Sequence, residues 1–136
     1  MMKTDPPYCI SLTVRGYELD SYGHVNNAVY LQYLEQARWM MMRDANFLEQ
    51  IDAEKLFLVV IDTHIRYLRE AILFDELVVE TLLKIEKPYL VFIHKILNKK
   101  EGCLLSRATI KTIFVNEQRM PLDIPDFILQ NISTLT

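Results

Sequence analysis

The chain has 136 residues, 51% of them hydrophobic, and its formal net charge is −3 at pH 7. This length and apolar content suit a single domain with one core, and we expect one domain over residues 1–136. The weakly acidic balance argues against the basic surface that nucleic-acid binding requires, and no apolar run reaches the roughly 20 residues of a membrane span.

The first residues and the cysteines indicate a cellular compartment. Residues 1–7 lack the apolar stretch of a signal peptide. The two cysteines, Cys9 and Cys103, are far apart and do not have the spacing of metal ligands. We therefore expect reduced thiols, no metal site and a cytoplasmic protein.

The first part of the chain predicts a strand, a polar loop and a long helix. Residues 8–14 are rich in β-formers and alternate loosely, which indicates a strand. After the loop, Asn26 or Asn27 can cap a helix, because either side chain can accept from first-turn N–H groups. In residues 28–45 apolar side chains recur at spacings of three and four around most of the circumference. Such a helix should be covered on more than one side, as a curved sheet would do.

The second part of the chain predicts consecutive strands. Residues 44–55 are polar and indicate a loop with a short helical turn, and from residue 56 the apolar period changes from helical to two. The predicted strands are 59–67, which should have one buried face, then 77–85, 90–97 and 106–115, and a short helix is expected at 126–132. Strands that follow one another without crossover helices favour an antiparallel sheet and an α+β fold. Its open edges predict self-association.

The most distinctive stretch is the loop before the long helix. Eight consecutive residues contain a carboxylate (Asp20), a flexible glycine (Gly23), a histidine (His24) and two asparagines (Asn26 and Asn27). The first N–H groups of a helix lack intrahelical partners, and the helix dipole favours negative charge there. The loop and helix start can therefore hold a phosphate, a carboxylate or a developing oxyanion.

These residues belong to a longer pattern, Asp20-x-x-Gly23-His24-Val25-Asn26-Asn27-x-x-Tyr30-x-x-Tyr33-x-Glu35-x-x-Arg38. The pattern resembles the signature of the hotdog-fold thioesterases of the 4-hydroxybenzoyl-CoA thioesterase type. Residues 65–69, 75–79 and 119–125 are similar to later segments of the same family. The resemblance implies a five-stranded antiparallel sheet wrapped around one long central helix, assembled as a homodimer or homotetramer.

By this resemblance the protein is an acyl-thioester hydrolase acting on acyl-CoA or acyl-carrier-protein. Asp20 would be the catalytic carboxylate, as general base or as nucleophile, and the backbone N–H of Asn27 would polarise the carbonyl oxygen. CoA or phosphopantetheine would enter as part of the substrate, without a separate cofactor, and the site would lie at a dimer interface. The residues expected to bind substrate or shape its site are Gly23, His24, Asn26 and Tyr30.

Several alternatives stay open at this point. Asp20 also suits an ordinary turn, where Asp, Ser and Gly are common. A non-catalytic module that binds acyl thioesters is the main functional alternative, and a hotdog dehydratase is a second, although its usual helix motif is missing here. Glu18 holds a position that is acidic in many relatives, and His24 is expected to support the loop.

Outside the loop, Tyr30 and Tyr33 should lie in the helix core with hydrogen-bonded hydroxyls. Glu35 and Arg38, three residues apart, should form an ion pair. His64 and His94 are predicted to be structural, and residues 39–42 are expected in the core or, less favoured, along an acyl pocket. The candidate cations for substrate phosphates are Arg66, Arg69, Lys99 and Lys100.

Overall fold

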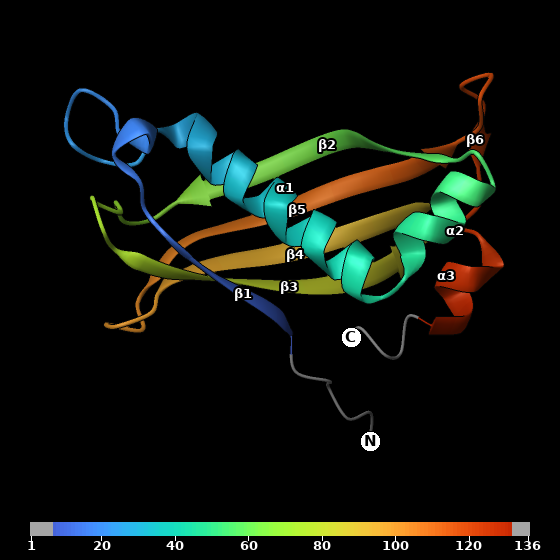
Figure 1. The fold of residues 1–136 in the computed structure, drawn as a ribbon. Helices are drawn as coiled ribbons and strands as arrows, with labels where there is room; N and C mark the ends of the chain where they lie inside the picture. Colours follow the sequence, from blue (N-terminus) through green and yellow to red (C-terminus); the bar gives the residue numbers. More distant parts are fainter. Residues whose placement is uncertain (1–6, 132–136) are drawn as a thin grey trace.

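A long helix, α1 (Asn27–Asp44), lies across the concave face of an antiparallel sheet in the computed structural model, which describes residues 7–131 (Figure 1). The strands are β1 (Tyr8–Thr13), β2 (Phe57–Tyr67), β3 (Glu76–Glu86), β4 (Tyr89–Asn98), β5 (Leu104–Val115) and the short β6 (Pro121–Leu122). The remaining elements are the 3₁₀ turn η1 (Gly16–Glu18) and the short helices α2 (Phe47–Ala53) and α3 (Asp126–Asn131).

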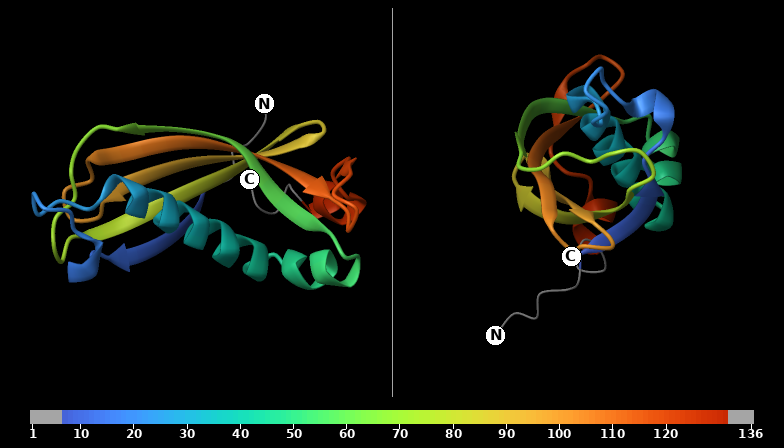
Figure 2. Two further views of the ribbon diagram at one scale, coloured as in Figure 1. Left: turned by 90° about the horizontal axis from the view of Figure 1, so that it is seen from above. Right: turned by 90° about the vertical axis from the view of Figure 1, so that its left-hand side faces the viewer.

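The strand order in the sheet is β1-β3-β4-β5-β2, with every neighbouring pair antiparallel and β6 added beside β5. The end-on view in Figure 2 shows the sheet curving around α1. The predicted α+β arrangement of five antiparallel strands around one helix is therefore confirmed, with β6 as a small addition.

The start of α1 is fixed by Asn26, whose side-chain oxygen accepts from the N–H of Ala28 at 2.9 Å. Of the two asparagines considered as caps, Asn26 is thus the one that caps the helix. The buried positions of α1 face the sheet and comprise Tyr30, Tyr33, Leu34, Ala37, Met41 and Met42. Trp39 is 55% exposed, so the expectation of core packing is confirmed for its neighbours Met41 and Met42 but is wrong for Trp39.

The central strands have the alternating burial that period-two patterning predicts. Along β5 the inward side chains Ala108, Ile110, Thr112 and Phe114 are all buried. The turn before β5 contains Gly102 at φ 74°, a conformation that glycine adopts without a steric cost. These strands therefore present one continuous apolar face to α1.

Strand β2 is different, because none of its residues is buried in the single chain. The prediction of one buried face is wrong here for two reasons. The register of β2 against β5 shifts between Val60 and Asp62, which interrupts the alternation. In addition β2 is an edge strand, and large apolar side chains such as Phe57 and Ile61 remain about half exposed.

The predicted ion pair between Glu35 and Arg38 is also wrong, since the Arg38 guanidinium instead lies 3.2 Å from Nε2 of His94. His94 is fully buried and its Nδ1 lies 2.9 Å from the Thr81 hydroxyl, so it is a structural residue as expected. His64 is exposed on β2. No helix within residues 7–131 is both long and apolar enough to cross a bilayer, and Ile132 of the predicted C-terminal helix lies outside the described residues.

Candidate active site

Asp20 closes a tight loop with its own neighbours. One carboxylate oxygen, Oδ1, accepts from the N–H groups of Tyr22 at 2.9 Å and His24 at 3.2 Å. The backbone N–H of Asp20 donates to the carbonyl oxygen of His24 at 2.7 Å. Gly23 completes the turn at φ 81°, and a Cβ there would meet no atom within 4 Å, so glycine is needed for the backbone angle and not for space.

The second carboxylate oxygen of Asp20, Oδ2, has no protein hydrogen-bond partner among residues 7–131. Only Oδ1 of Asp20 therefore takes part in the hydrogen bonds of the turn. The other oxygen is available to a ligand or a water molecule.

The first amide of α1 has no partner within the described residues. The N–H of Ala28 donates to the Asn26 side chain, and the N–H of Val29 donates to the Asn26 carbonyl at 2.9 Å. Within the described chain no acceptor faces the N–H of Asn27, the first residue of the helix. A donor that the fold leaves unused at the positive end of a helix is suited to an oxyanion.

An open concavity of about 450 Å³ brings these groups together. The predicted residues that line it are Asp20, His24, Asn27 and Tyr30, and the residues that sequence reasoning did not assign to the site are Val25, Tyr67, Leu68 and Glu70, together with the candidate phosphate ligand Arg69. Gly23 and Asn26 do not line the concavity: the first shapes the loop and the second caps the helix. In the described residues no group of three His, Cys, Asp or Glu side chains is placed to hold a metal ion.

Tyr67, at the end of β2, connects this strand to the start of α1. Its hydroxyl donates to the carbonyl oxygen of Asn27 at 2.9 Å, and its ring packs edge-on against Tyr30 with 5.3 Å between centroids. The Tyr30 hydroxyl accepts from the N–H of Ala71 at 3.1 Å. Burial raises the pKa of both tyrosines, which keeps them protonated. In the sequence, Tyr67 is visible only as an aromatic residue at a strand end, on the same strand face as Ile65. That pattern does not identify a site residue by itself.

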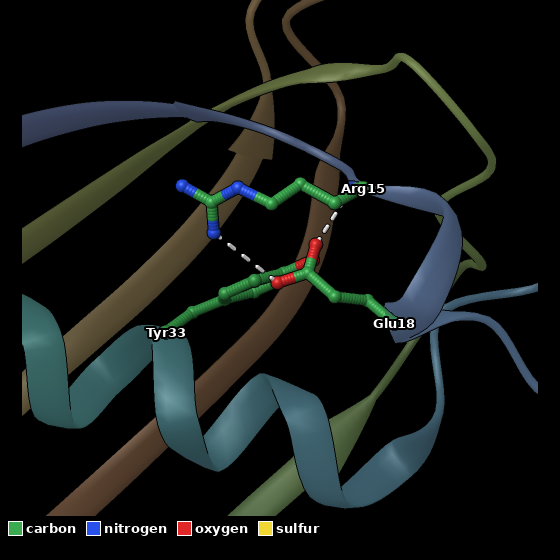
Figure 3. Close-up of polar contacts among 3 residues, drawn as sticks. All are labelled: Arg15, Glu18 and Tyr33. Carbon is green, nitrogen blue, oxygen red and sulfur yellow. Dashed lines mark hydrogen bonds and ion pairs between the residues drawn. The ribbon is translucent and has the colours of Figure 1, made fainter.

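Glu18 anchors the loop to the helix, because it contacts both Arg15 of the loop and Tyr33 of α1 (Figure 3). Glu18 is buried, with 7% of the residue exposed. Its carboxylate accepts from the Tyr33 hydroxyl at 2.8 Å and from the backbone N–H of Arg15 at 2.7 Å, and the Arg15 guanidinium lies 3.5 Å away. The Glu18 carbonyl accepts from the N–H of Asn26 at 2.9 Å. Burial and the bond to Glu18 raise the pKa of Tyr33 well above its usual range. Glu18 thus fixes the position of Asp20, two residues further on.

Comparison with known proteins places this geometry in context. The family described as the thioesterase-like superfamily matches residues 14–132. Over 73 residues the chain is 41% identical to the long-chain acyl-CoA thioesterase FadM of Escherichia coli K12, an alignment that covers 54% of this chain and 55% of that protein. The match therefore spans about half the length of this curated relative.

Solved structures match over nearly the whole chain. The probable thioesterase YbaW from Escherichia coli superposes with a TM-score of 0.86 at 27% identity, covering 95% of this chain and 99% of that one. The 1,4-dihydroxy-2-naphthoyl-CoA thioesterase Slr0204 from Synechocystis superposes with a TM-score of 0.86 at 18% identity, covering 94% and 96%. The second likeness concerns the fold alone. Together with the family match, the first confirms the expected hotdog fold.

Proposed function

The chain belongs to the thioesterase-like superfamily, and on that premise we propose that it hydrolyses acyl thioesters to a free acid and a thiol. One observation carries the proposal. Within the described residues the Asp20 Oδ2 and the Asn27 N–H have no protein partner, and both residues line one concavity. Hydrolysis of a thioester needs these two groups: one to deliver the nucleophile and one to receive the charge that develops on the carbonyl oxygen.

The Asn27 amide is the proposed oxyanion donor. Attack on the thioester carbonyl moves an electron pair onto its oxygen, and a donor already fixed in position stabilises that charge without reorganising. The positive end of the α1 dipole adds to the effect. The bond from Tyr67 to the Asn27 carbonyl and the cap from Asn26 hold this first turn in place.

Asp20 supplies the nucleophile in one of two ways. As a general base, Oδ2 takes a proton from water while the water oxygen attacks the carbonyl carbon. As a nucleophile, Oδ2 attacks the carbon itself and forms an anhydride that water then hydrolyses. In both cases the carbon–sulfur bond breaks and the thiolate leaves as CoA or the carrier thiol. Oδ1 accepts from two backbone N–H groups, which leaves Oδ2 free for either step.

Acyl-CoA is the proposed substrate, by analogy with the thioesterases that this chain resembles. Arg69 borders the concavity and is placed to meet a phosphate of the CoA or phosphopantetheine arm. Acyl-carrier-protein is the second candidate, because it presents the same phosphopantetheine arm. Neither changes the roles of Asp20 and Asn27.

We also propose that the protein works as a homodimer or a larger assembly built from such dimers. The edge strand β2 carries Phe57, Val59, Val60 and Ile61, each at least 40% exposed. An apolar strand edge of this kind favours pairing with a second copy. Because Tyr67 at the end of β2 lines the site, a partner on this edge would supply a further wall to an otherwise open concavity.

The test is release of free thiol from a panel of acyl-CoA esters, short and long, aliphatic and aromatic. Turnover that depends on enzyme concentration supports the proposal and gives the acyl preference. If no CoA ester is cleaved, the same acyl groups on carrier protein are tested next. Saturable binding of both thioester types without release of thiol would contradict hydrolysis and favour the non-catalytic binding module.

A further inference from the structure

Glu70 is a second carboxylate residue in the wall of the concavity around Asp20. It precedes Ala71, whose carbonyl accepts from the N–H of Val25 at 2.9 Å and whose own N–H donates to the Tyr30 hydroxyl at 3.1 Å. The first bond connects the segment between β2 and β3 to the loop of Asp20, and the second connects it to α1. These backbone bonds hold the segment of Glu70 beside the groups proposed for the reaction.

The carboxylate of Glu70 has no protein partner. Within residues 7–131 it forms no hydrogen bond and no ion pair, and the residue is exposed. The neighbouring Arg69 lines the same concavity but does not pair with it. When Arg69 meets a substrate phosphate, as proposed above, the formal charges left on this wall are those of Asp20 and Glu70, with histidine counted as neutral. Both of these charges are negative.

The charges of Glu70 and Asp20 act on the same hydroxyl group, that of Tyr30. Burial is the largest cause of the raised pKa of Tyr30, and both carboxylates add to the rise because each repels the charge of a deprotonated hydroxyl. Tyr30 also lines the concavity, so an anion bound beside it meets the same two repulsions. A neutral group of the same size does not meet them.

We propose that Glu70 determines which acyl groups the site accepts. Neutral acyl chains enter, whereas chains that carry a carboxylate close to the thioester, such as malonyl and succinyl, are rejected by the paired charges of Glu70 and Asp20. Like charges brought together in a binding site exclude the wrong ligand in this way. The inference rests on the acyl-CoA hydrolysis proposed above. The acid that hydrolysis releases is itself an anion in the same place, so the two carboxylates also favour its departure.

The test uses two CoA thioethers of the same size, S-(carbamoylmethyl)-CoA and S-(carboxymethyl)-CoA, which differ only in a neutral amide against a carboxylate. Each is titrated calorimetrically into the full chain in its solution assembly at low ionic strength. The amide should bind about tenfold more tightly than the carboxylate, and added salt should reduce the difference because the charges are exposed. Equal affinities would overturn the proposal, and so would a failure of both thioethers to bind.

A pair of variants assigns the discrimination to one residue. Glu70→Gln should tighten binding of the carboxymethyl compound about threefold or more and change binding of the carbamoylmethyl compound less than about twofold. The control is Glu54→Gln, which removes the same charge at an exposed residue after α2, at the opposite end of the molecule from the Asp20 loop (Figure 1). It should keep the wild-type ratio of affinities. A wild-type ratio in Glu70→Gln would overturn the proposal and leave the discrimination to Asp20.

Binding and turnover separate this inference from the proposed hydrolysis. The predicted difference between the two thioethers, without release of thiol from any acyl-CoA, would support the role of Glu70 in binding and contradict hydrolysis. Equal affinities in a protein that does release thiol would contradict the role of Glu70 and leave hydrolysis supported.

Discussion

The hydroxyl of Tyr67 donates to the carbonyl oxygen of Asn27 at 2.9 Å, so the last residue of β2 is bound to the first residue of α1. The same Asn27 carries the backbone N–H that has no acceptor within the described chain. The contact thus connects the exposed edge of the sheet to the amide that we propose as oxyanion donor.

Removing the Tyr67 hydroxyl should loosen the first turn of α1 while the aromatic ring stays in the wall of the site. Tyr67→Phe keeps the ring against Tyr30 and loses one hydrogen bond, worth about 1 kcal/mol. We expect kcat to fall about fivefold with KM nearly unchanged, because the bond positions a group that acts in the transition state. Tyr17→Phe, at a side chain that is 81% exposed, is the matched control. A rise in KM with normal kcat would instead make Tyr67 a substrate contact.

The role of the Asn27 amide can be tested with a residue that has no N–H. Proline is well tolerated at the first position of a helix, and Asn26 already has an extended conformation with ψ 138°, which suits a residue before proline. Asn27→Pro should therefore fold normally and lower kcat about a hundredfold, the usual effect of losing one oxyanion donor. Circular dichroism and thermal unfolding check the fold.

The control for this variant is Asn27→Ala, which removes the side chain and keeps the N–H. It should retain nearly normal turnover, because the side chain neither caps the helix nor is assigned a role in the reaction. Equal loss of activity in both variants would mean that the Asn27 side chain, and not its amide, is the group that matters.

The sequence predicted the loop, the helix and the strand succession well, because those features depend on local patterns. Caps, a glycine turn and apolar periodicity are set by neighbouring residues, and Asn26, Gly23 and the inward side chains of β5 have the expected places. Asp20 and Asn27 are close in the chain, so one local stretch with a family resemblance was enough to propose them together, and both line the same concavity.

The rest depends on contacts between distant segments. Tyr67 reaches Asn27 across forty residues, and Arg38 bonds His94 across fifty-six, so neither contact leaves a mark in a local pattern. The predicted Glu35–Arg38 pair failed for the same reason, because tertiary burial drew the guanidinium toward β4. The exposure of β2 was missed because alternating apolar residues predict a buried strand face. The pattern does not distinguish burial within the chain from burial against a second chain.

Stability should fall in acid because His94 is buried as a neutral group. Its pKa is about 3 in the folded protein and near 6.5 when unfolded, so below pH 6.5 the unfolded state binds the proton that the folded state rejects. The stabilising contribution is present above pH 6.5 and is lost as the pH falls toward 3. Between pH 7 and pH 5 we expect a loss of about 2 kcal/mol from this group, measured by urea unfolding.

Two variants identify the group responsible for this acid sensitivity. His94→Gln should be less stable at pH 7 but should lose much less stability on acidification than the wild type. His64→Gln, at an exposed strand position, should retain the wild-type pH dependence. An unchanged slope in His94→Gln would assign the acid sensitivity to other groups.

Charge on the edge of β2 should prevent self-association. Ile61 is 48% exposed, and Ile61→Lys should leave the single chain folded while placing a cation on the apolar edge. We expect sedimentation velocity to show a shift from dimer or tetramer to monomer, with a loss of turnover if the partner completes the site. Leu82→Lys, at a 37% exposed position on the interior strand β3, adds the same single charge and is the control. A wild type that sediments as a monomer would contradict the proposed assembly.

The most direct test of the account is the rate of acyl-CoA hydrolysis by Asp20→Asn beside the wild type. Asparagine keeps Oδ1, so the bonds from the N–H groups of Tyr22 and His24 and the shape of the loop should persist. We expect kcat to fall roughly a hundredfold or more with thermal stability unchanged. In the variant an amide NH₂ replaces Oδ2, and this group can neither take a proton nor attack the carbonyl carbon. Turnover equal to the wild type in a folded variant would contradict the account and would remove Asp20 from the reaction.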